Sequence, residues 1–159
     1  MLHVCVGIGS NLGDREANLR FAVDKIRESE GKVRVSSLFE SEAWGYHSDN
    51  PFYNIVAEFD TDKDAYALLD FLQTVEKEAG SGSHRDKEGG YVDRVLDIDI
   101  IFIGGEVMES GRLIVPHPKM AEREFVLVPL AELSPGWVHP LSGLTVVEML
   151  RRLKCHIGH

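Results

Sequence analysis

The stretch of sequence that decides the fold is Arg94-Val95-Leu96-Asp97-Ile98-Asp99-Ile100-Ile101. Its aliphatic and β-branched side chains predict a strand over residues 95–103, which the pair Gly104-Gly105 ends. Side chains alternate between the two faces of a strand. Asp97 and Asp99 are therefore expected on one face, while the leucine and isoleucines beside them enter the core on the other.

Two carboxylates on one face of a strand repel each other unless a cation lies between them. Mg²⁺ suits Asp97 and Asp99, because it takes oxygen ligands, keeps several waters and is commonly shared with the phosphates of a substrate. The alternative is that both aspartates lie on the solvated face of an edge strand. Asp is depleted in strands, which weakens that alternative for a run this apolar.

Earlier in the chain, the pattern predicts three more strands and two helices. The strands are expected over residues 2–8, 32–40 and 52–60, with the last two paired, and the helices after Asp14 and after Asp62 or Asp64. The apolar stripes of the helices are Leu19, Ala22, Val23 and Ile26 in the first, and Ala65, Leu68, Leu69, Leu72 and Val75 in the second. The order strand, helix, strand, strand, helix, strand predicts an α+β fold, a ferredoxin-like sandwich with an antiparallel sheet and two helices on one face.

A C-terminal extension is expected beyond this core. Residues 106–115 predict a short hairpin, residues 125–133 a short helix, and Thr145 with Glu148 a capping box that opens a last helix ending near Leu153. The polar loop over residues 81–92 is long for a compact domain and is expected to serve as a lid or binding loop.

Length and composition favour one domain over residues 1–159, since 43% hydrophobic residues suffice for one core. Neither Cys5 nor Cys155 has a partner at metal-ligand spacing. The net charge of −9 argues against nucleic-acid binding but not against a single nucleotide. No secretory signal or membrane-spanning run is recognised, so we expect a soluble, cytoplasmic protein without a fused domain or a membrane partner.

Two further groups of residues are candidates for binding. Arg112, His117 and Arg123 could meet phosphate oxygens, with His117 held between two prolines, although each is by default an ordinary surface or core residue. Phe52 and Phe125 could stack on the two faces of a flat heterocycle, and the side-chain amide of Asn54 could form hydrogen bonds with its edge. The alternative is that both phenylalanines belong to the core.

Two polar or Gly-rich features need separate interpretation. Glu76 falls at the edge of the buried stripe of its helix, where a carboxylate needs a partner. The glycines at positions 7, 9 and 13 do not form a phosphate loop, because their spacing is G-x-G-x-x-x-G and no Gly-Lys-Ser/Thr follows.

Taken in order, these segments resemble 6-hydroxymethyl-7,8-dihydropterin pyrophosphokinase over nearly the whole chain. The motifs that carry the resemblance are Gly9-Ser10-Asn11-Leu12-Gly13, Phe52-Tyr53-Asn54, Asp93-Arg94-Val95-Leu96-Asp97-Ile98-Asp99-Ile100, Val115-Pro116-His117-Pro118, Arg123-Glu124-Phe125-Val126-Leu127, Pro129-Leu130-Ala131-Glu132 and His139-Pro140. Each motif is modest by itself, but the ordered set is specific.

The resemblance implies transfer of pyrophosphate from ATP to the hydroxymethyl group of the pterin, giving the pterin pyrophosphate and AMP in folate synthesis. It implies two Mg²⁺ ions on Asp97 and Asp99, with Arg94 and Arg85 as further catalytic residues. The implied pterin contacts are Phe52, Asn54, Phe125, Ser41 and Ala43. The implied ATP contacts are Gln73, Glu76, Arg94, Arg112, His117 and Arg123. The enzyme is expected to act as a monomer on these two small molecules.

The chain departs from the family pattern mainly in the loop after Gly80. The family commonly has Gly-Arg-x-Arg there and Trp-Gly-Pro-Arg before the aspartates, whereas this chain has Gly80-Ser81-Gly82-Ser83-His84-Arg85 and Tyr91-Val92-Asp93-Arg94. Arg85 and Tyr91 are the candidates to replace the missing Arg and Trp, and Ala43 stands where a proline is frequent.

Two other functions fit the same residues. A metal-dependent phosphohydrolase would use the two aspartates to hydrolyse nucleotides without a pterin. A ferredoxin-like module for small molecules would bind without turnover.

Overall fold

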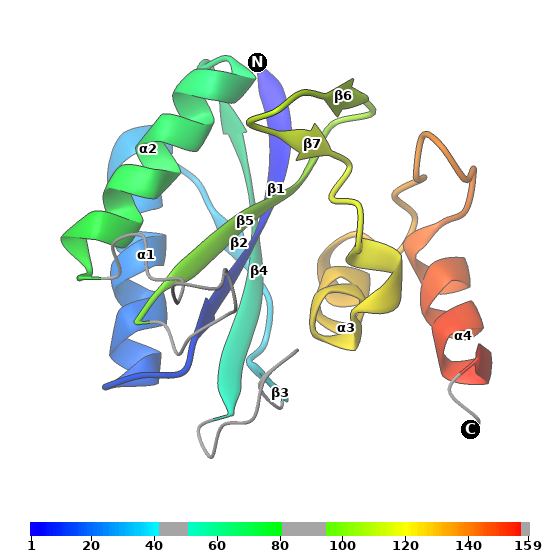
Figure 1. Cartoon of the computed structure of the whole chain (residues 1–159), viewed down its shortest axis with the longest axis horizontal. Coiled ribbons are helices and arrows are strands. Elements are labelled where there is room, and N and C mark those ends of the chain that lie inside the picture. Colours follow the sequence, from blue (N-terminus) through cyan, green and yellow to red (C-terminus); the bar gives the residue numbers. More distant parts are fainter. Residues whose placement is uncertain (42–50, 81–94, 157–159) are drawn as a thin grey trace.

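The computed structural model describes residues 1–41, 51–80 and 95–156 (Figure 1). In chain order its elements are β1 (Leu2–Ser10), α1 (Arg15–Glu30), β2 (Arg34–Val35), β3 (Phe39–Ser41), β4 (Phe52–Thr61), α2 (Ala65–Glu78), β5 (Asp97–Ile103), β6 (Met108–Glu109), β7 (Ile114–Val115), the 3-10 turn η1 (Met120–Glu122), α3 (Glu124–Leu133) and α4 (Val146–His156). Within these described ranges, every helix is too short or too polar to cross a membrane.

The main sheet has the strand order β2-β4-β1-β5, and β3 also pairs with β4. All of these pairs are antiparallel, while β6 and β7 form a separate hairpin. The order of the elements and the antiparallel sheet confirm the predicted ferredoxin-like α+β fold.

The prediction of one strand over residues 32–40 is wrong, because two short strands, β2 and β3, replace it. Ser36 lies between them and is buried. Its amide donates to the carbonyl oxygen of Val56 at 3.0 Å, and its hydroxyl accepts from the amide of Val56 at 2.9 Å. A side-chain oxygen thus takes the place of a backbone carbonyl, which interrupts the regular ladder.

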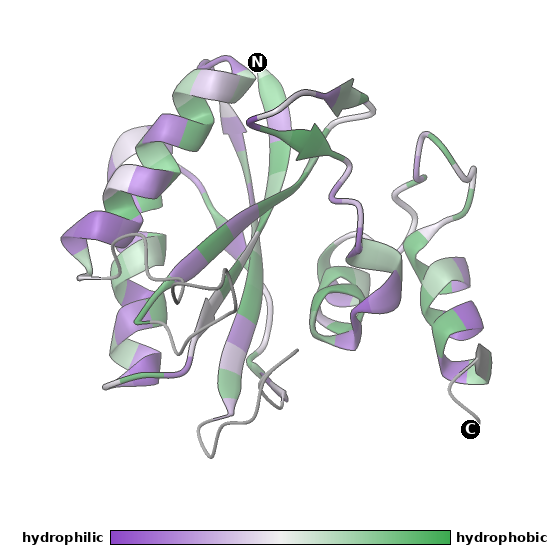
Figure 2. Cartoon of the chain, viewed as in Figure 1, coloured by the Kyte–Doolittle hydropathy of each residue, from purple (hydrophilic) through white to green (hydrophobic). Residues whose placement is uncertain are grey.

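Helices α1 and α2 cover one face of the sheet, as predicted (Figure 1). Asp14 and Asp64 cap them by accepting from the amides of Ala17 and Ala67. The predicted stripes are buried except for Leu69, which is only partly buried. Figure 2 shows hydrophobic and hydrophilic residues alternating along both helices, as their one-sided burial requires.

The C-terminal extension packs on the opposite face of the sheet. Its core joins Cys5, Val56 and Phe102 from the strands to α3 and α4, and α3 lies between the sheet and α4 (Figure 1). Trp137 stacks on Phe102 with ring centroids 4.2 Å apart and donates its indole N–H to the carbonyl oxygen of Gly104. Helices therefore cover both faces, the two core helices on one and the extension on the other.

A β-bulge interrupts the pairing of β1 with β5. Cys5 pairs with Phe102 and Val6 with Ile100, so Ile101 is an extra residue on β5. Ile101 and Phe102 consequently both enter the core beneath α3, although they are consecutive. The carbonyl oxygen of Ile101 accepts from the backbone amide of His117 at 2.8 Å.

A polar cluster ties the extension to the strands. Glu58 is buried on β4 and accepts from Nε2 of His3 at 2.7 Å and from the hydroxyl of Ser134 at 2.7 Å, with an Arg34 guanidinium nitrogen 3.9 Å away. Nδ1 of His3 lies 2.9 Å from a carboxylate oxygen of Asp60. Burial by itself lowers the pKa of His3, but the hydrogen bonds and negative charges of the two carboxylates outweigh it and raise that pKa above 6.5.

Thr145→Ala tests the capping box that opens α4. Thr145 accepts from the amide of Glu148 at 3.1 Å, and the Glu148 carboxylate accepts from the amide of Thr145 at 3.0 Å. Because the substitution takes away the acceptor of the Glu148 amide at the helix end, we expect the free energy of unfolding to fall by about 1 kcal/mol in urea titrations. The control is Thr74→Ala on α2, where the hydroxyl only bonds back to the Asp70 carbonyl and its loss should cost nothing.

His3→Gln tests the polar cluster through the pH dependence of stability. The folded pKa of His3 is raised, so its stabilising effect is full below pH 6.5 and is lost as pH rises through the folded pKa. We expect the difference in free energy of unfolding between wild type and variant to shrink over that rise, in urea titrations at several pH values. A difference that stays constant with pH would contradict the assignment of a protonated His3.

Candidate functional site

Asp97 and Asp99 lie on the face of β5 opposite the two core helices, as predicted. Leu96, Ile98 and Ile100 are buried in the core beneath α1 and α2, and the aspartates between them are partly exposed. The side chain of Asp99 is 42% exposed. The alternation of a regular strand thus presents two carboxylates to the same space.

Glycines occupy the neighbouring positions on β1. Gly9 is paired with Asp97 and Gly7 with Asp99, and on its other side Gly9 is paired with Asn54 of β4. A Cβ at Gly9 would lie 3.1 Å from Oδ1 of Asn54 and 3.3 Å from Cδ1 of Phe52. Gly9 therefore lets Asn54 and Phe52 lie closely over β1, and Cδ1 of Ile101 lies 3.3 Å from the position of a Cβ at Gly7.

The sequence interpretation missed this role of Gly7 and Gly9, having only rejected a phosphate loop. A usable signal was present, because glycines two residues apart inside a strand indicate a close approach on one face.

Asn54 and Ser41 meet on this face. Asn54 is only 6% exposed, and its Nδ2 donates to the carbonyl oxygen of Phe39 at 3.0 Å and to the hydroxyl of Ser41 at 2.8 Å. These two acceptors fix the orientation of the amide, so Oδ1 is the atom turned toward Gly9. Ser41 and Asn54 are thus brought together, whereas Ala43 lies outside the described residues.

The two candidate aromatic residues are half-buried on different elements. Phe52 begins β4, and Phe125 lies in the first turn of α3, which packs against β3 and β4. Phe125 also lies beside Arg123, whose guanidinium carbon is 5.3 Å from its ring centroid.

Arg123 lies between the acidic and the aromatic parts of the site. Its side chain is 11% exposed, and one guanidinium nitrogen is 3.9 Å from a carboxylate oxygen of Asp99. Its Nε is buried without a hydrogen-bond partner among the described residues. A buried donor in that state is suited to an anionic ligand.

His117 is neutral at physiological pH. Burial, and then the positive charges of Arg123 and Lys119, lower its pKa to about 4. Its Nδ1 accepts from the backbone amide of Lys119 at 3.1 Å, so the proton of the neutral ring lies on Nε2. His117 can therefore donate one hydrogen bond without adding charge.

Glu76 has the partner that its position on α2 requires. One of its carboxylate oxygens accepts from the backbone amide of Ile98, between the two aspartates, at 2.7 Å. This bond satisfies an amide on the edge of β5 that faces away from β1 and holds the strand against α2. Gln73 is exposed one turn earlier on the same helix.

Of the remaining predicted residues, the structure describes only Arg112, and it does not bring Arg112 to this site. Arg112 is exposed, pairs with Asp70 at 2.5 Å and lies 5.5 Å from the Tyr66 ring centroid. Arg85 and Arg94, like the loop over residues 81–92, fall outside the described residues.

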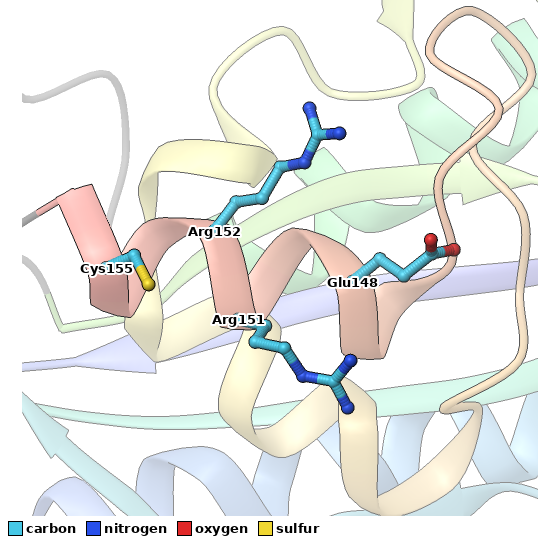
Figure 3. Close-up of a pocket in the computed structure, with 4 residues that line it drawn as sticks. All are labelled: Glu148, Arg151, Arg152 and Cys155. Atoms are coloured by element: carbon cyan, nitrogen blue, oxygen red, sulfur yellow. The ribbon is translucent and has the colours of Figure 1, made fainter.

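A separate hollow of about 550 Å³ lies against α4 and is lined by Glu148, Arg151, Arg152 and Cys155 (Figure 3). Arg151 and Arg152 extend in different directions from the helix in that view. The four residues include none of the candidates above, so this hollow does not mark the site.

Comparison with known proteins identifies the family. The model of 7,8-dihydro-6-hydroxymethylpterin-pyrophosphokinase (HPPK) matches residues 5–135. The chain is 36% identical to the 2-amino-4-hydroxy-6-hydroxymethyldihydropteridine pyrophosphokinase of Aquifex aeolicus over 89% of this chain and 86% of that one. The protein of the same name from Bacillus subtilis is 39% identical over 80% of this chain and 75% of that one.

Longer proteins also contain a similar segment. The folic acid synthesis protein fol1 of Pneumocystis carinii is 36% identical over 96% of this chain, which spans 20% of that protein. A crystal structure of HPPK-DHPS in complex with substrates superposes with a TM-score of 0.75 at 13% identity, covering 98% of this chain and 44% of that one. From its sequence match over residues 5–135, and from the fold, this chain belongs to the 7,8-dihydro-6-hydroxymethylpterin-pyrophosphokinase family.

Proposed function

We propose that this chain transfers the pyrophosphoryl group of ATP to the hydroxymethyl group of 6-hydroxymethyl-7,8-dihydropterin, giving the pterin pyrophosphate and AMP in folate biosynthesis. The family and the names of its relatives support this activity. The structural observation that carries it is that Asp97, Asp99 and Asn54 lie on the same face of the sheet. Only β1, with a glycine at position 9, separates Asp97 from Asn54.

Asp97 and Asp99 are proposed to hold two Mg²⁺ ions. The fit rests on two partly exposed carboxylates on one face of β5, whose paired residues on β1 are glycines without side chains. Two carboxylates without a closed protein cage suit Mg²⁺, which shares its remaining positions with water and substrate phosphates. Bound there, Mg²⁺ supplies charge neutralisation for the triphosphate.

Arg123 and His117 are proposed to hold phosphate oxygens. Arg123 offers a buried guanidinium near Asp99, and neutral His117 offers the Nε2–H described above. Donors fixed in place before reaction stabilise charge that develops on the leaving AMP at little reorganisation cost. Arg85, Arg94, Arg112 and Gln73 are proposed as further ATP contacts from the resemblance alone.

The pterin is proposed to lie between Phe52 and Phe125, with its edge at Asn54. Because Nδ2 of Asn54 is held by Phe39 and Ser41, its Oδ1 is the atom proposed to accept from an N–H of the heterocycle. Ser41 would act by orienting this amide, and Ala43 through its backbone.

Catalysis is then mainly positioning, because transfer needs the pterin hydroxyl in line with the β-phosphorus of ATP. Glu76 is proposed to contribute mainly through its hydrogen bond to the amide of Ile98, which holds β5 in place between the two aspartates. The loop over residues 81–92 is proposed to close over both substrates and exclude water.

The wider setting is also a proposal. Residues 1–159 are proposed to act as one pyrophosphokinase domain, as a monomer in the cytoplasm, on two small molecules and without nucleic-acid or membrane partners. The net charge of −9 supports the exclusion of nucleic acid.

AMP release from ATP and Mg²⁺, measured with and without 6-hydroxymethyl-7,8-dihydropterin, tests the activity. We expect AMP only when the pterin is present, because the acceptor hydroxyl comes from it. Equal nucleotide hydrolysis without pterin would instead indicate a phosphohydrolase. Pterin binding in calorimetry without any turnover would indicate a binding module.

Asp97→Ala tests the metal assignment. We expect turnover to be abolished, since one carboxylate beside the triphosphate is lost, while pterin binding measured by calorimetry stays detectable because Phe52 and Asn54 are intact. Asp62→Ala, an exposed carboxylate in the turn before α2, serves as the control and should leave the rate unchanged. Near-normal activity of Asp97→Ala would reject the assignment.

A further inference from the structure

Arg15 makes two contacts across the fold to the beginning of β4. Arg15 is the first residue of α1, and its Nη1 donates to the carbonyl oxygen of Pro51 at 2.9 Å. Its guanidinium carbon also lies 3.9 Å from the ring centroid of Tyr53. One side chain therefore holds the residue before Phe52 and the residue after it.

Helix stability does not explain Arg15. The first turn of a helix carries the positive end of the macrodipole, so a cation there is unfavourable by a few tenths of a kcal/mol or more. The cap of α1 is supplied separately by Asp14. The contacts of Arg15 with β4 are thus the feature that accounts for a guanidinium at this position.

Phe52 and Asn54 point away from Arg15. Tyr53 packs with the core on the helix side of the sheet, while Asn54 and Phe52 lie over Gly9 on the other side. Arg15 consequently holds the β4 backbone from behind the face on which Phe52 and Asn54 lie. The aspartates are on β5, with β1 between them and β4.

We propose that Arg15 is a positioning residue for the pterin, which fixes the backbone of Phe52 and Asn54 without touching either substrate. The inference rests on the proposed pterin contacts of those two residues. It requires Arg rather than Lys, because only a planar guanidinium can lie on the Tyr53 ring while donating to a carbonyl. The effect should fall on pterin binding and spare ATP.

Arg15→Lys is the direct test, with AMP release measured against each substrate in turn while the other is saturating. We expect the KM for the pterin to rise roughly 5- to 10-fold, from the loss of one hydrogen bond and one cation–π contact, with the KM for ATP unchanged. The matched control is Arg20→Lys, an exposed arginine of the same helix, for which neither KM should change.

Tyr53 provides a second route that does not depend on Arg15 variants folding well. Tyr53→Leu removes the ring and should also raise the KM for the pterin. Tyr53→Phe keeps the ring, and its KM for the pterin should equal that of the wild type. In the double variant Arg15→Lys/Tyr53→Leu, the two losses should not multiply, because the paired contact can be lost only once.

Two results overturn the inference. One is a pterin KM that is unchanged in both Arg15→Lys and Tyr53→Leu, and the other is an equal rise in the KM values of both substrates. Failure of the proposed function is seen separately, as absence of pterin-dependent AMP release by the wild type. Calorimetric titration with 6-hydroxymethyl-7,8-dihydropterin, in the presence of Mg²⁺ and the α,β-methylene analogue of ATP, checks that the KM change reflects binding.

Discussion

The pairing of β1 with β5 is the constraint on which the site depends. Its register sets Gly9 beside Asp97 and Gly7 beside Asp99. A slip of one residue would turn both carboxylates into the core beneath α1 and α2. The alternating burial of β5 opposes such a slip, because Ile98 and Ile100 would then leave the core. The same register therefore decides both which side chains of β5 pack in the core and on which face the two aspartates lie.

The electrostatics of the site differ from those of the whole chain. The chain carries a net charge of −9, yet the side chain of Arg123 is held only 11% exposed beside Asp99. His117 adds a donor while staying uncharged, because burial and the neighbouring cations lower its pKa to about 4. The local charge at Arg123 is therefore positive although the chain as a whole is acidic.

Much of this architecture follows from residue periodicity. The alternation around Asp97 and the helical stripes predicted the fold class and the facing of both aspartates. The break at Ser36 could not be predicted, because it depends on a hydroxyl meeting the amide of Val56 across the sheet. The pairing of Asn54 with Ser41, the role of Gly9 and the reach of Arg15 likewise depend on strand order, which brings together residues distant in sequence.

The bulge at Ile101 divides β5 into two halves whose side chains make different contacts. Before Ile101, polar and apolar side chains alternate; from Ile101 on, the consecutive Ile101 and Phe102 both pack beneath the C-terminal helices. The extra residue also turns a carbonyl toward His117 and anchors the segment that leads to Arg123. Because of this single irregularity, β5 presents the carboxylates of Asp97 and Asp99 at one end and, at the other end, anchors the segment that leads to Arg123.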